Sequence, residues 1–572
     1  MNTSHYSNND RQQPDKQGKK TGYSLVLLVG LIVFHVVHNI LWIFLNNTPP
    51  SYDAAFHTVI SLRFFDYIRT HFFSFNLYEF LTISNYYPPF IHWFGALLGI
   101  FSPFDARVVQ LSGTIFLSLS LVFSYLLTDV IFKNKRIAIL ATFLFSFFVM
   151  VVKEGRSHML DIPLTAVILA SLYFLIASKY FTNRRRTAAF FVFVAVGFLI
   201  KWVAPIFVLV PFLFTLYTAF SKKEAREKVY THLLEGIVIV VLVASPWYII
   251  NLRQIFYTAA VSKTANLDNP TILTSLENIL FYPKLIINFQ THFIGFILFF
   301  ISCILFIAKA RRKEWWFFII IPIIFQYLFF TFGIENKNVR YLIPTMPFVA
   351  MIMAWGVEYV FKKGKLFLMG YASFVMVYMV AAYYILSFGL FLSPKYKKAV
   401  HFPAVGWMDI YYVHTDPVPL LYTNINWNST DKEIASFLSK TCMKQNHFSR
   451  FFINVEKPYI SGSIVNIALY SLLQSVPQTF QEVDTDFIRY TGGKEKFIGE
   501  RELDDYLSMV DCAVIPQTTA GIGSRPGLRQ FAVRSQINEY FIQGRVKGFE
   551  KVKEIAQPDG EVLIFFKRTS ID

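Results

Sequence analysis

Long apolar runs separated by short polar segments fill the first two-thirds of this 572-residue chain. A helix needs about 20 apolar residues to cross a membrane. The runs that approach this length are 23–46, 106–130, 137–152, 162–178, 188–203, 204–220, 233–250, 291–308, 315–334, 341–360 and 366–390. This pattern predicts an α-helical polytopic membrane protein with about eleven spans.

One further run, 88–103, is shorter and bracketed by prolines, so the topology depends on whether it crosses. If it does not cross, all the basic loops fall on the cytoplasmic side, as the positive-inside rule requires. These loops are 132–136, 183–186, 222–228, 309–313 and 361–365. We therefore predict that 88–103 is a half-inserted or interfacial helix. The outer segments are then 47–105, 153–161, 251–290, 335–340 and everything after about residue 391.

The polar ends of the chain complete the predicted organisation. Residues 1–22 are polar and basic and predict a disordered cytoplasmic tail, and 23–390 form the transmembrane region. Residues 391–572 alternate short β-rich runs with helical patterns, which predicts an exported soluble α/β domain. In that domain, Thr430 and Glu433 have the spacing of a capping box before a helix near 431–441. Strands are expected at 451–455 and 512–516, and a hairpin at 558–560.

Composition excludes several classes of protein. Apolar residues make up 54% of the chain and charged residues 16%, with 63 Phe, unlike a disordered, collagenous or ordinary soluble chain. Three cysteines without a CxxC pair give neither a disulfide framework nor a structural zinc site. The net charge of +17 sits in short loops between apolar runs, which indicates membrane topology and no nucleic-acid partner.

Charged residues next to membrane spans are costly and are candidates for function. Asp53 follows the first span, and His57 lies four residues later on the same helical face. Alone, Asp53 is better explained as a turn residue or an N-terminal acid of an interfacial helix than as a functional group. Glu154, Arg156, His158 and Asp161 lie together between two spans, where Asp161 could instead be a helix-capping acid.

Cations complete this outer face. Lys337 and Arg340 are basic on the side where basic residues are rare, and both types bind phosphate well. Lys201 ends a span, and we interpret it first as a lysine that snorkels to the interface. Together these groups predict one site with two carboxylates and two or more cations at the bilayer edge. A ligand with an anionic head and an apolar tail, such as a lipid phosphate, fits it.

The chain resembles the GT-C membrane glycosyltransferases, in the branch similar to bacterial protein O-mannosyltransferases and lipid A aminoarabinose transferases (ArnT-like). The motifs that carry the resemblance are Asp53 in PPSYDAAFH, NYYPPFIHWFGAL at 85–97, R-x-x-M-L-D-x-P at 156–163, GFLIKW at 197–202 and RYLIPTMPFVA at 340–350. The sequence departs from the family where Ala54 follows the first-loop acid, at Tyr87-Pro88, and at Ile-Lys-Trp 200–202. These departures concern the metal and the sugar more than the class.

The resemblance implies inverting transfer of a sugar from a polyprenyl-phosphate-linked donor to an extracytoplasmic hydroxyl or phosphate of a lipid, protein or glycan. Asp53 takes the role of base, and Asp161 orients the acceptor. Lys337 and Arg340 hold the lipid phosphate, with Arg156, Tyr87 and Lys201 as further substrate-binding residues. With Asp161, His57 or His158 is a candidate ligand of a divalent cation; no other cofactor is expected.

Two other functions remain open on the sequence alone. A flippase or transporter of lipid-linked sugars would also carry charges near a lipid path. It is less favoured, because no repeated halves are visible and the charges gather at one face. A membrane scaffold would leave these charges unexplained. The expected location is a bacterial inner membrane, with the N-terminus cytoplasmic and the C-terminal domain outside.

Overall fold

The computed structural model describes the membrane region almost throughout and the C-terminal region in part. The described residues are 14–46, 48–50, 52–221, 226–265, 273–309, 312–334, 337–388, 399–402, 406–409, 428–443, 449–455, 460–474, 476, 480–482, 503, 507–522, 529–558 and 560–569.

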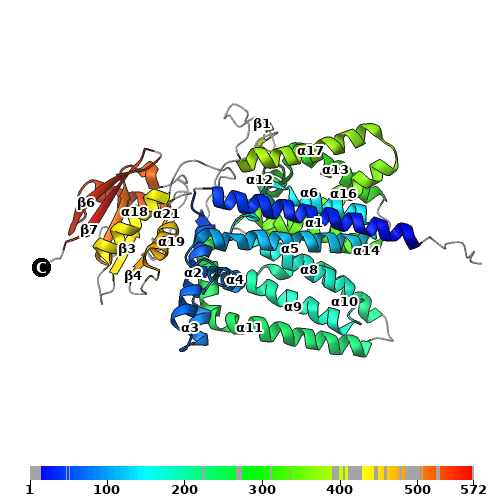
Figure 1. The fold of residues 1–572 in the computed structure, drawn as a ribbon, viewed down its shortest axis with the longest axis horizontal. Helices are drawn as coiled ribbons and strands as arrows, with labels where there is room; N and C mark the ends of the chain where they lie inside the picture. Colours follow the sequence, from blue (N-terminus) through cyan, green and yellow to red (C-terminus); the bar gives the residue numbers. More distant parts are fainter. Residues whose placement is uncertain are drawn as a thin grey trace, which may run out of the picture.

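A bundle of long helices forms the main body (Figure 1). Its helices are α1 (Pro14–Leu45), α5 (Ala106–Phe132), α6 (Lys135–Ser146), α7 (Val149–Glu154), α8 (Asp161–Ala177), α9 (Arg184–Ile200), α10 (Ala204–Ser221), α11 (Arg226–Ala265), α12 (Leu276–Ile286), α13 (His292–Lys309), α14 (Lys313–Trp315), α15 (Ile321–Phe332), α16 (Met346–Lys362) and α17 (Leu366–Phe388). Short π- and 3-10 segments, η2 (Ile287–Thr291), η3 (Trp316–Ile320) and η4 (Val339–Thr345), continue into α13, α15 and α16.

The predicted membrane spans are largely confirmed. In the described part of the chain, eight helical stretches are long and apolar enough to cross a membrane. The runs at 162–178 and 188–203 form α8 and α9, whose 17 residues each rise about 26 Å. The run at 137–152 is not one helix, because it is interrupted at Phe147 and Phe148 between α6 and α7. The chain is thus a polytopic helical membrane protein, with eight of the eleven predicted spans established by length.

Three short helices lie at one end of the bundle, between it and the C-terminal region (Figure 1). They are α2 (Tyr52–Thr70), α3 (Leu77–Thr82) and α4 (Phe90–Gly99). Helix α4 occupies the ambiguous run at 88–103, and its ten residues rise about 15 Å, half of a hydrocarbon core. The prediction that this run does not span is consistent with that length. Helix α1 begins at Pro14, so part of the predicted disordered tail is helical.

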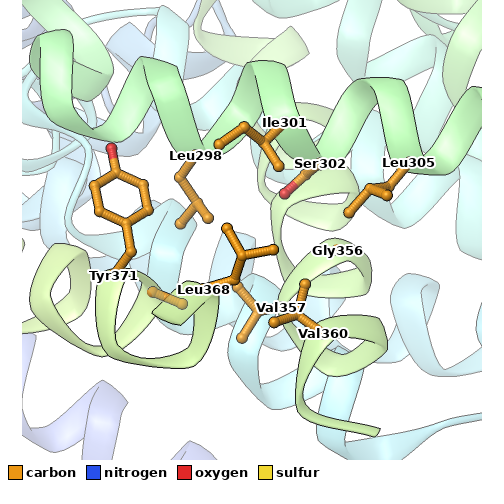
Figure 2. A pocket seen from close by; sticks show the side chains of 10 residues that line it. Leu298, Ile301, Ser302, Leu305, Gly356, Val357, Val360, Leu368 and Tyr371 are labelled. Atoms are coloured by element: carbon orange, nitrogen blue, oxygen red, sulfur yellow. The ribbon is translucent and has the colours of Figure 1, made fainter. Parts of the chain in front are cut away.

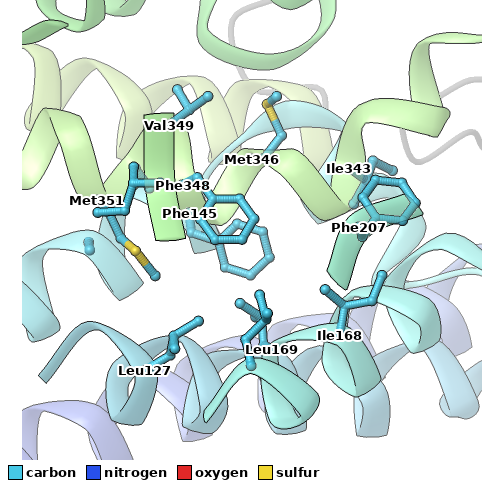
Figure 3. Packing of buried hydrophobic residues seen from close by; sticks show 14 of the residues in the cluster. Leu127, Phe145, Ile168, Leu169, Phe207, Ile343, Met346, Phe348, Val349 and Met351 are labelled. Atoms are coloured by element: carbon cyan, nitrogen blue, oxygen red, sulfur yellow. The ribbon is translucent and has the colours of Figure 1, made fainter. Parts of the chain in front are cut away.

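Helix α16 runs through the centre of the bundle and is buried on nearly all sides. Its side chains Phe348 and Met351 lie among Leu127, Phe145 and Leu169 of the surrounding helices (Figure 3). A helix that is apolar all round can be buried in this way, whereas an amphipathic one cannot. Because η4 leads directly into α16, the polar residues of η4 are anchored to the most buried helix.

A small apolar pocket lies between α13, α16 and α17 (Figure 2). Gly356 of α16 allows this helix to approach α13 closely, because a Cβ at Gly356 would lie 2.3 Å from Ser302 Oγ. The polar side chains that line the pocket are Ser302 and Tyr371, and the Tyr371 hydroxyl already donates a hydrogen bond to the Ile294 carbonyl. No charged side chain lines the pocket, so it does not suit an anionic head group.

The C-terminal region contains a five-stranded sheet with the order β4-β3-β5-β7-β6. The strands are β3 (Ser449–Ile453), β4 (Phe480–Glu482), β5 (Cys512–Pro516), β6 (Phe549–Ala556) and β7 (Val562–Arg568); a separate pair is β1 (Ala399–Phe402) and β2 (Gly406–Asp409). Strands β3, β4 and β5 are parallel, and β7 pairs antiparallel with β5 and β6. The predicted strands and the hairpin are confirmed.

Helices cover both faces of this sheet. They are α18 (Asn428–Phe437), continued by η6 (Leu438–Cys442), α19 (Gly462–Leu473) and α21 (Arg529–Ile542), with the short η8 (Thr519–Ile522) after β5. Phe451 and Val514 pack against α18 and α19, whereas Phe452 and Ala513 pack against α21. This alternation is the period of two expected for a sheet buried on both faces. The α/β architecture of the region is therefore confirmed.

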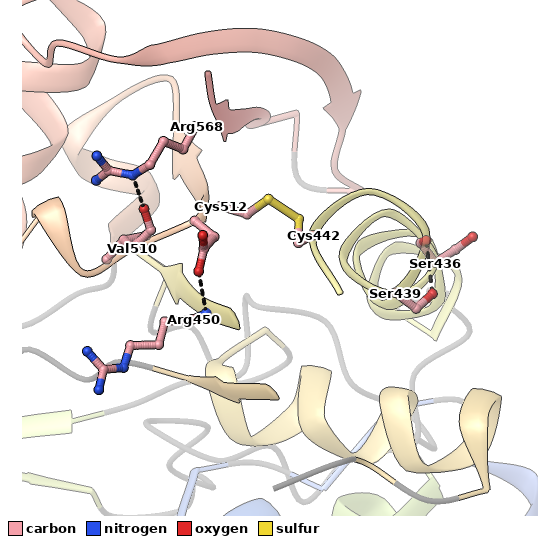
Figure 4. The surroundings of a disulfide bond; sticks show 8 residues. Ser436, Ser439, Cys442, Arg450, Val510, Cys512 and Arg568 are labelled. Carbon is pink, nitrogen blue, oxygen red and sulfur yellow. Dashed lines mark hydrogen bonds between the residues drawn. A yellow bond between two sulfur atoms is a disulfide. The ribbon is translucent and has the colours of Figure 1, made fainter. Parts of the chain in front are cut away.

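In the C-terminal region, the predicted helix cap was wrong, and a disulfide was not predicted. Helix α18 begins at Asn428, so Thr430 lies inside its first turn and is not the residue that caps it. Cys442 and Cys512 form a disulfide that joins η6 to β5 (Figure 4). Three cysteines gave no framework, but a single bridge needs only two residues that the fold brings together.

Removing this disulfide is expected to destabilise the C-terminal region. The bridge closes a loop with a sequence separation of 70 residues, which corresponds to about 4 kcal/mol of unfolded-state entropy in the chain-entropy model. Cys512→Ala should lower the unfolding midpoint of this region in limited proteolysis. Cys303→Ala, which removes the free cysteine, is the control and should leave the midpoint unchanged.

Candidate active site

Four helix ends bring the predicted charged residues together. Asp53 lies in the first turn of α2, and Asp161 is the first residue of α8. Lys201 directly follows the last turn of α9, and Arg340 lies in η4. Carboxylates at helix N-termini and a lysine at a helix C-terminus are each favoured by the helix dipole. The positions therefore suit the charges even before the side chains pair.

The side chains form one continuous ionic cluster. Arg340 Nη2 is paired with Asp53 Oδ2, and Arg340 Nε lies 3.7 Å from Asp161 Oδ2. Lys201 Nζ donates to Asp161 Oδ1 at 2.8 Å. Asp161 is 2% exposed at its side chain, whereas Asp53 is 45% exposed. Arg340 thus bridges a buried carboxylate and an accessible one.

Close packing of α5 against the 155–160 segment holds Asp161 in place. A Cβ at Gly113 would lie 2.4 Å from the Ser157 carbonyl oxygen, so only glycine permits this approach. Thr114 Oγ1 donates to the Gly155 carbonyl at 3.1 Å, which fixes the same segment. The turn before α8 is therefore set by α5.

The electrostatic state of Asp53 is controlled mainly by Arg340. The guanidinium lowers the pKa of the Asp53 carboxyl below its ordinary value, against the opposing effect of burial. Lys201 and Lys153 act in the same direction. Asp53 is consequently ionised at neutral pH and able to accept a proton.

Several predicted and unpredicted residues surround the cluster. Burial and the nearby Asp53 carboxylate both raise the pKa of the Tyr87 hydroxyl. Tyr341 was not predicted; its ring faces Lys201 Nζ at 4.5 Å from the centroid. Lys153 was also missed, and it pairs with buried Glu154 at 3.4 Å. Tyr341 directly follows the predicted Arg340, and this position was the signal in the sequence that could have identified it.

The structure changes the interpretation of Lys201, whereas the role of Lys337 stays a prediction. Lys337 is 5% exposed and precedes η4, close in sequence to Arg340. Glu335, two residues before it and a possible local partner from the sequence, lies outside the described residues. Lys201 does not snorkel, because its ammonium is directed to Asp161 and its side chain is only 13% exposed. Lys201 is a member of the ionic cluster.

Arg156 has different surroundings from the cluster. Its Nε donates to Asn39 Oδ1 of α1 at 2.8 Å, and its guanidinium lies over the rings of Trp42 and Tyr383. These residues belong to α1 and α17, and Arg156 is 1% exposed. No ion pair of Arg156 is found with the described residues of the cluster, so its predicted role in phosphate binding gains no support from this geometry.

His57 of α2 and His158, which precedes α8, are buried in a hydrogen-bond network between α2, α4 and α5. His57 Nδ1 lies 3.0 Å from His92 Nε2, while His158 contacts Ser61 Oγ and Ser112 Oγ, both at 2.7 Å. Helix α4 presses against this network, since a Cβ at Gly95 would lie 2.5 Å from Ser61 Oγ. The network ties α2, α4 and α5 together.

This network does not fit the suggested metal site. Both ring nitrogens of His158 already have serine partners. Within the described ranges, no group of three or more His, Cys, Asp or Glu is arranged to hold a metal ion. These residues give no support to a metal-dependent step, and metal dependence stays a prediction from the sequence.

The buried histidines predict a loss of stability in acid. Burial lowers the pKa of His158 to about 3, so the folded protein leaves it neutral where the unfolded chain binds a proton. Stability should fall as pH falls from about 6.5 towards 3, by about 1.4 kcal/mol per pH unit for this residue. Melting curves of the detergent-solubilised protein at pH 7.5 and 5 test this: His158→Gln should flatten the dependence. His71→Gln, next to the end of α2, should keep it, and an equal slope in all three proteins contradicts the interpretation.

Comparisons with known proteins agree with this architecture. The sequence model of the family described as dolichyl-phosphate-mannose-protein mannosyltransferase matches residues 90–259, which include Asp161 and Lys201. No curated protein sequence matches the chain.

One solved structure is similar in fold, and a second structure of the same protein also matches the chain. ArnT from Cupriavidus metallidurans bound to undecaprenyl phosphate is 13% identical, with 95% of this chain and 98% of that chain covered and a TM-score of 0.57. The apo state of the same protein is 15% identical, with 79% and 75% covered and a TM-score of 0.47. The predicted resemblance to GT-C membrane glycosyltransferases and the GT-C fold are confirmed.

Proposed function

We propose that this chain, which has the fold of GT-C membrane glycosyltransferases, transfers a sugar from a polyprenyl-phosphate donor to an extracytoplasmic acceptor. The observation that carries the proposal is the ionic cluster itself. An accessible carboxylate, Asp53, shares one guanidinium with the buried carboxylate Asp161. Transfer to a hydroxyl needs a proton acceptor and a cation for the leaving phosphate, and the cluster supplies both.

In the proposed reaction, Asp53 accepts the proton of the acceptor hydroxyl while that oxygen attacks the anomeric carbon. The bond from this carbon to the phosphate oxygen breaks, and its electron pair stays on the polyprenyl phosphate. Attack opposite to the leaving group inverts the configuration. Arg340 and Lys201 stabilise the phosphate charge, and Asp161 holds both cations in position.

Donor binding would also adjust the base. In the structure Arg340 lowers the pKa of Asp53, and a carboxyl with a low pKa is a weak base. A donor phosphate that draws the guanidinium away from Asp53 raises that pKa. Asp53 thereby becomes a stronger base only when a donor is present to react.

The names of the compared proteins support a polyprenyl phosphate as the lipid part of the donor. The matching family is described by a dolichyl-phosphate-linked mannose, and the ArnT structure is bound to undecaprenyl phosphate. Both are polyprenyl phosphates. Lys201 ends a helix next to the apolar bundle, so a phosphate held there leaves its chain among lipid-facing helices.

The acceptor side is proposed to be extracytoplasmic. Asp53 lies on α2, at the end of the bundle that carries the C-terminal sheet (Figure 1). That region contains the Cys442–Cys512 disulfide, and disulfides persist mainly in oxidising compartments. Helix α14, beside the basic loop 309–313, lies at the opposite end (Figure 1). A lipid, a protein and a surface glycan remain alternative acceptors.

Mass spectrometry of the cell envelope tests the proposal. Lipids, glycans and glycoproteins from cells that lack this protein are compared after complementation with the wild type or with Asp53→Asn. We expect one glycoconjugate to lose a single sugar that only the wild type restores. Unchanged masses in the deletion strain would overturn the proposal and favour transport of a lipid-linked sugar.

A further inference from the structure

Helix α19 of the C-terminal region has two buried faces. Val465 and Leu469 pack into the core of its own sheet. Ile464, Ile467 and Tyr470 instead pack into a separate cluster with side chains of α2 and α4. Residues spaced by three share a helical face, so α19 is a helix with one side for its sheet and the other for the membrane region.

The contact of α19 with α2 and with Phe104, which lies between α4 and α5, combines apolar packing with polar bonds. The Tyr470 ring stacks on Phe104 with 5.9 Å between the centroids, and Ser471 Oγ donates to the Phe104 carbonyl at 3.0 Å. Arg69 Nη2 of α2 donates to the Gln474 carbonyl at 2.7 Å. Figure 1 shows the two helices side by side at the end of the bundle.

The contacts fix the direction of α19 relative to α2. Tyr470 interacts with Arg63, and Gln474 with Arg69, so residue numbers rise in the same direction along both helices. At a rise of 1.5 Å per residue, eight residues back from Tyr470 to Gly462 cover the same distance as eight residues back from Arg63 to Ala55. The start of α19 therefore corresponds to the level of Ala55, two residues after Asp53.

We propose that α19 is a positioning element that holds the Asp53 end of α2 against the bundle. Helix α2 is not a membrane span, and α4 supports it from the bundle side. Ile464 and Ile467 belong to the same buried cluster as Ala55 and Val59 of α2, which lie within two helical turns of Asp53. Without α19, that part of α2 would lose its second packing surface, and Asp53 would lose its fixed distance to Arg340 and Asp161.

Such a role gives the C-terminal region a part in the reaction without direct contact to substrate. The catalytic consequence rests on the proposed function, whereas the positioning of α2 does not. Misplacement of a reacting group by about 1 Å can lower a rate by about a hundredfold. A loosened α2 would also weaken the Asp53–Arg340 pair, which raises the pKa of Asp53.

The test compares the two faces of α19 in the full-length protein in detergent. Ile467→Ala combined with Tyr470→Leu removes packing against α2, and Ile467→Val is a milder version that retains the fold. Leu469→Ala is the matched control, because it removes a buried side chain from the sheet face. Hydrogen exchange of the amides of residues 56–62 in α2 is the readout that needs no activity. We expect faster exchange in the Ile467 variants and wild-type exchange in Leu469→Ala.

Activity supplies the second readout. With an undecaprenyl-phosphate-linked sugar as donor, kcat of the double variant should fall about tenfold to a hundredfold. The acid limb of its pH profile should move to higher pH, an effect that a loss of folded protein alone does not cause. Unchanged exchange in α2 overturns the positioning role. Faster exchange in a protein whose wild type transfers no sugar supports the positioning role and overturns the proposed function.

Discussion

Asp53→Asn should lower sugar transfer by about a thousandfold while the protein still inserts and folds. The amide is nearly isosteric but cannot accept the proton of the attacking hydroxyl. Asp53 is 45% exposed at its side chain, so loss of its charge costs little stability compared with a buried acid. Initial rates with an undecaprenyl-phosphate-linked donor, at equal amounts of purified protein, measure the effect on kcat.

The control for this variant lies on a helix outside the cluster. Glu235 of α11 also pairs with an arginine, Arg184, at 2.9 Å. Glu235→Gln therefore removes an equivalent charge and an equivalent ion pair on a helix that carries no residue of the cluster, and it should retain wild-type kcat. Equal activity of Asp53→Asn and Glu235→Gln would remove Asp53 from the role of base.

The membrane topology could be predicted because its physical causes are local. A run of apolar residues reveals a span from composition alone, and the basic loops fix which runs cross. Helix α4 illustrates this, since ten residues cannot span whatever surrounds them. The interruption at Phe147 and Phe148 could not be predicted in this way. It contains no proline or glycine that would have marked the break in the sequence.

The candidate site was predicted in its members and less well in its pairing. Asp53 and Arg340 are 287 residues apart, so their contact depends on the tertiary arrangement of α2 and η4. Lys201 has the position of a snorkelling lysine, and only the nearby Asp161 makes it a member of the cluster. Arg156 belongs to the same motif as Asp161, yet it points to Asn39 because the turn before α8 separates the two side chains.

The histidines and the C-terminal region show a further limit of the sequence. A histidine near a carboxylate can be a metal ligand or a neutral hydrogen-bonding group, and the residue type does not decide. Here Ser61 and Ser112, from two other helices, occupy both nitrogens of His158. The second buried face of α19 is likewise visible only when α2 lies against it.

Arg340→Gln should lower kcat/KM for the lipid-linked donor by about a thousandfold. The guanidinium is the group that both carboxylates share and that the leaving phosphate would use. Its removal also takes the nearest positive charge from Asp53, which raises the pKa of that carboxyl. The acid limb of the pH profile should therefore move to higher pH, because Asp53 must lose its proton before it can act as base.

Two companion variants separate charge from geometry. Arg340→Lys keeps the positive charge but loses the planar guanidinium that reaches Asp53 and Asp161 together. Compared with Arg340→Gln, it should bring the acid limb of the pH profile closer to the wild-type position than it brings kcat/KM. Arg107→Gln removes a surface arginine that pairs with Asp105 at 2.8 Å. It should leave kcat/KM and the acid limb of the pH profile unchanged. A wild-type rate and acid limb in Arg340→Gln would mean that neither the phosphate nor Asp53 depends on this guanidinium. In that case Lys201 would be the remaining cation of the cluster able to stabilise the leaving group.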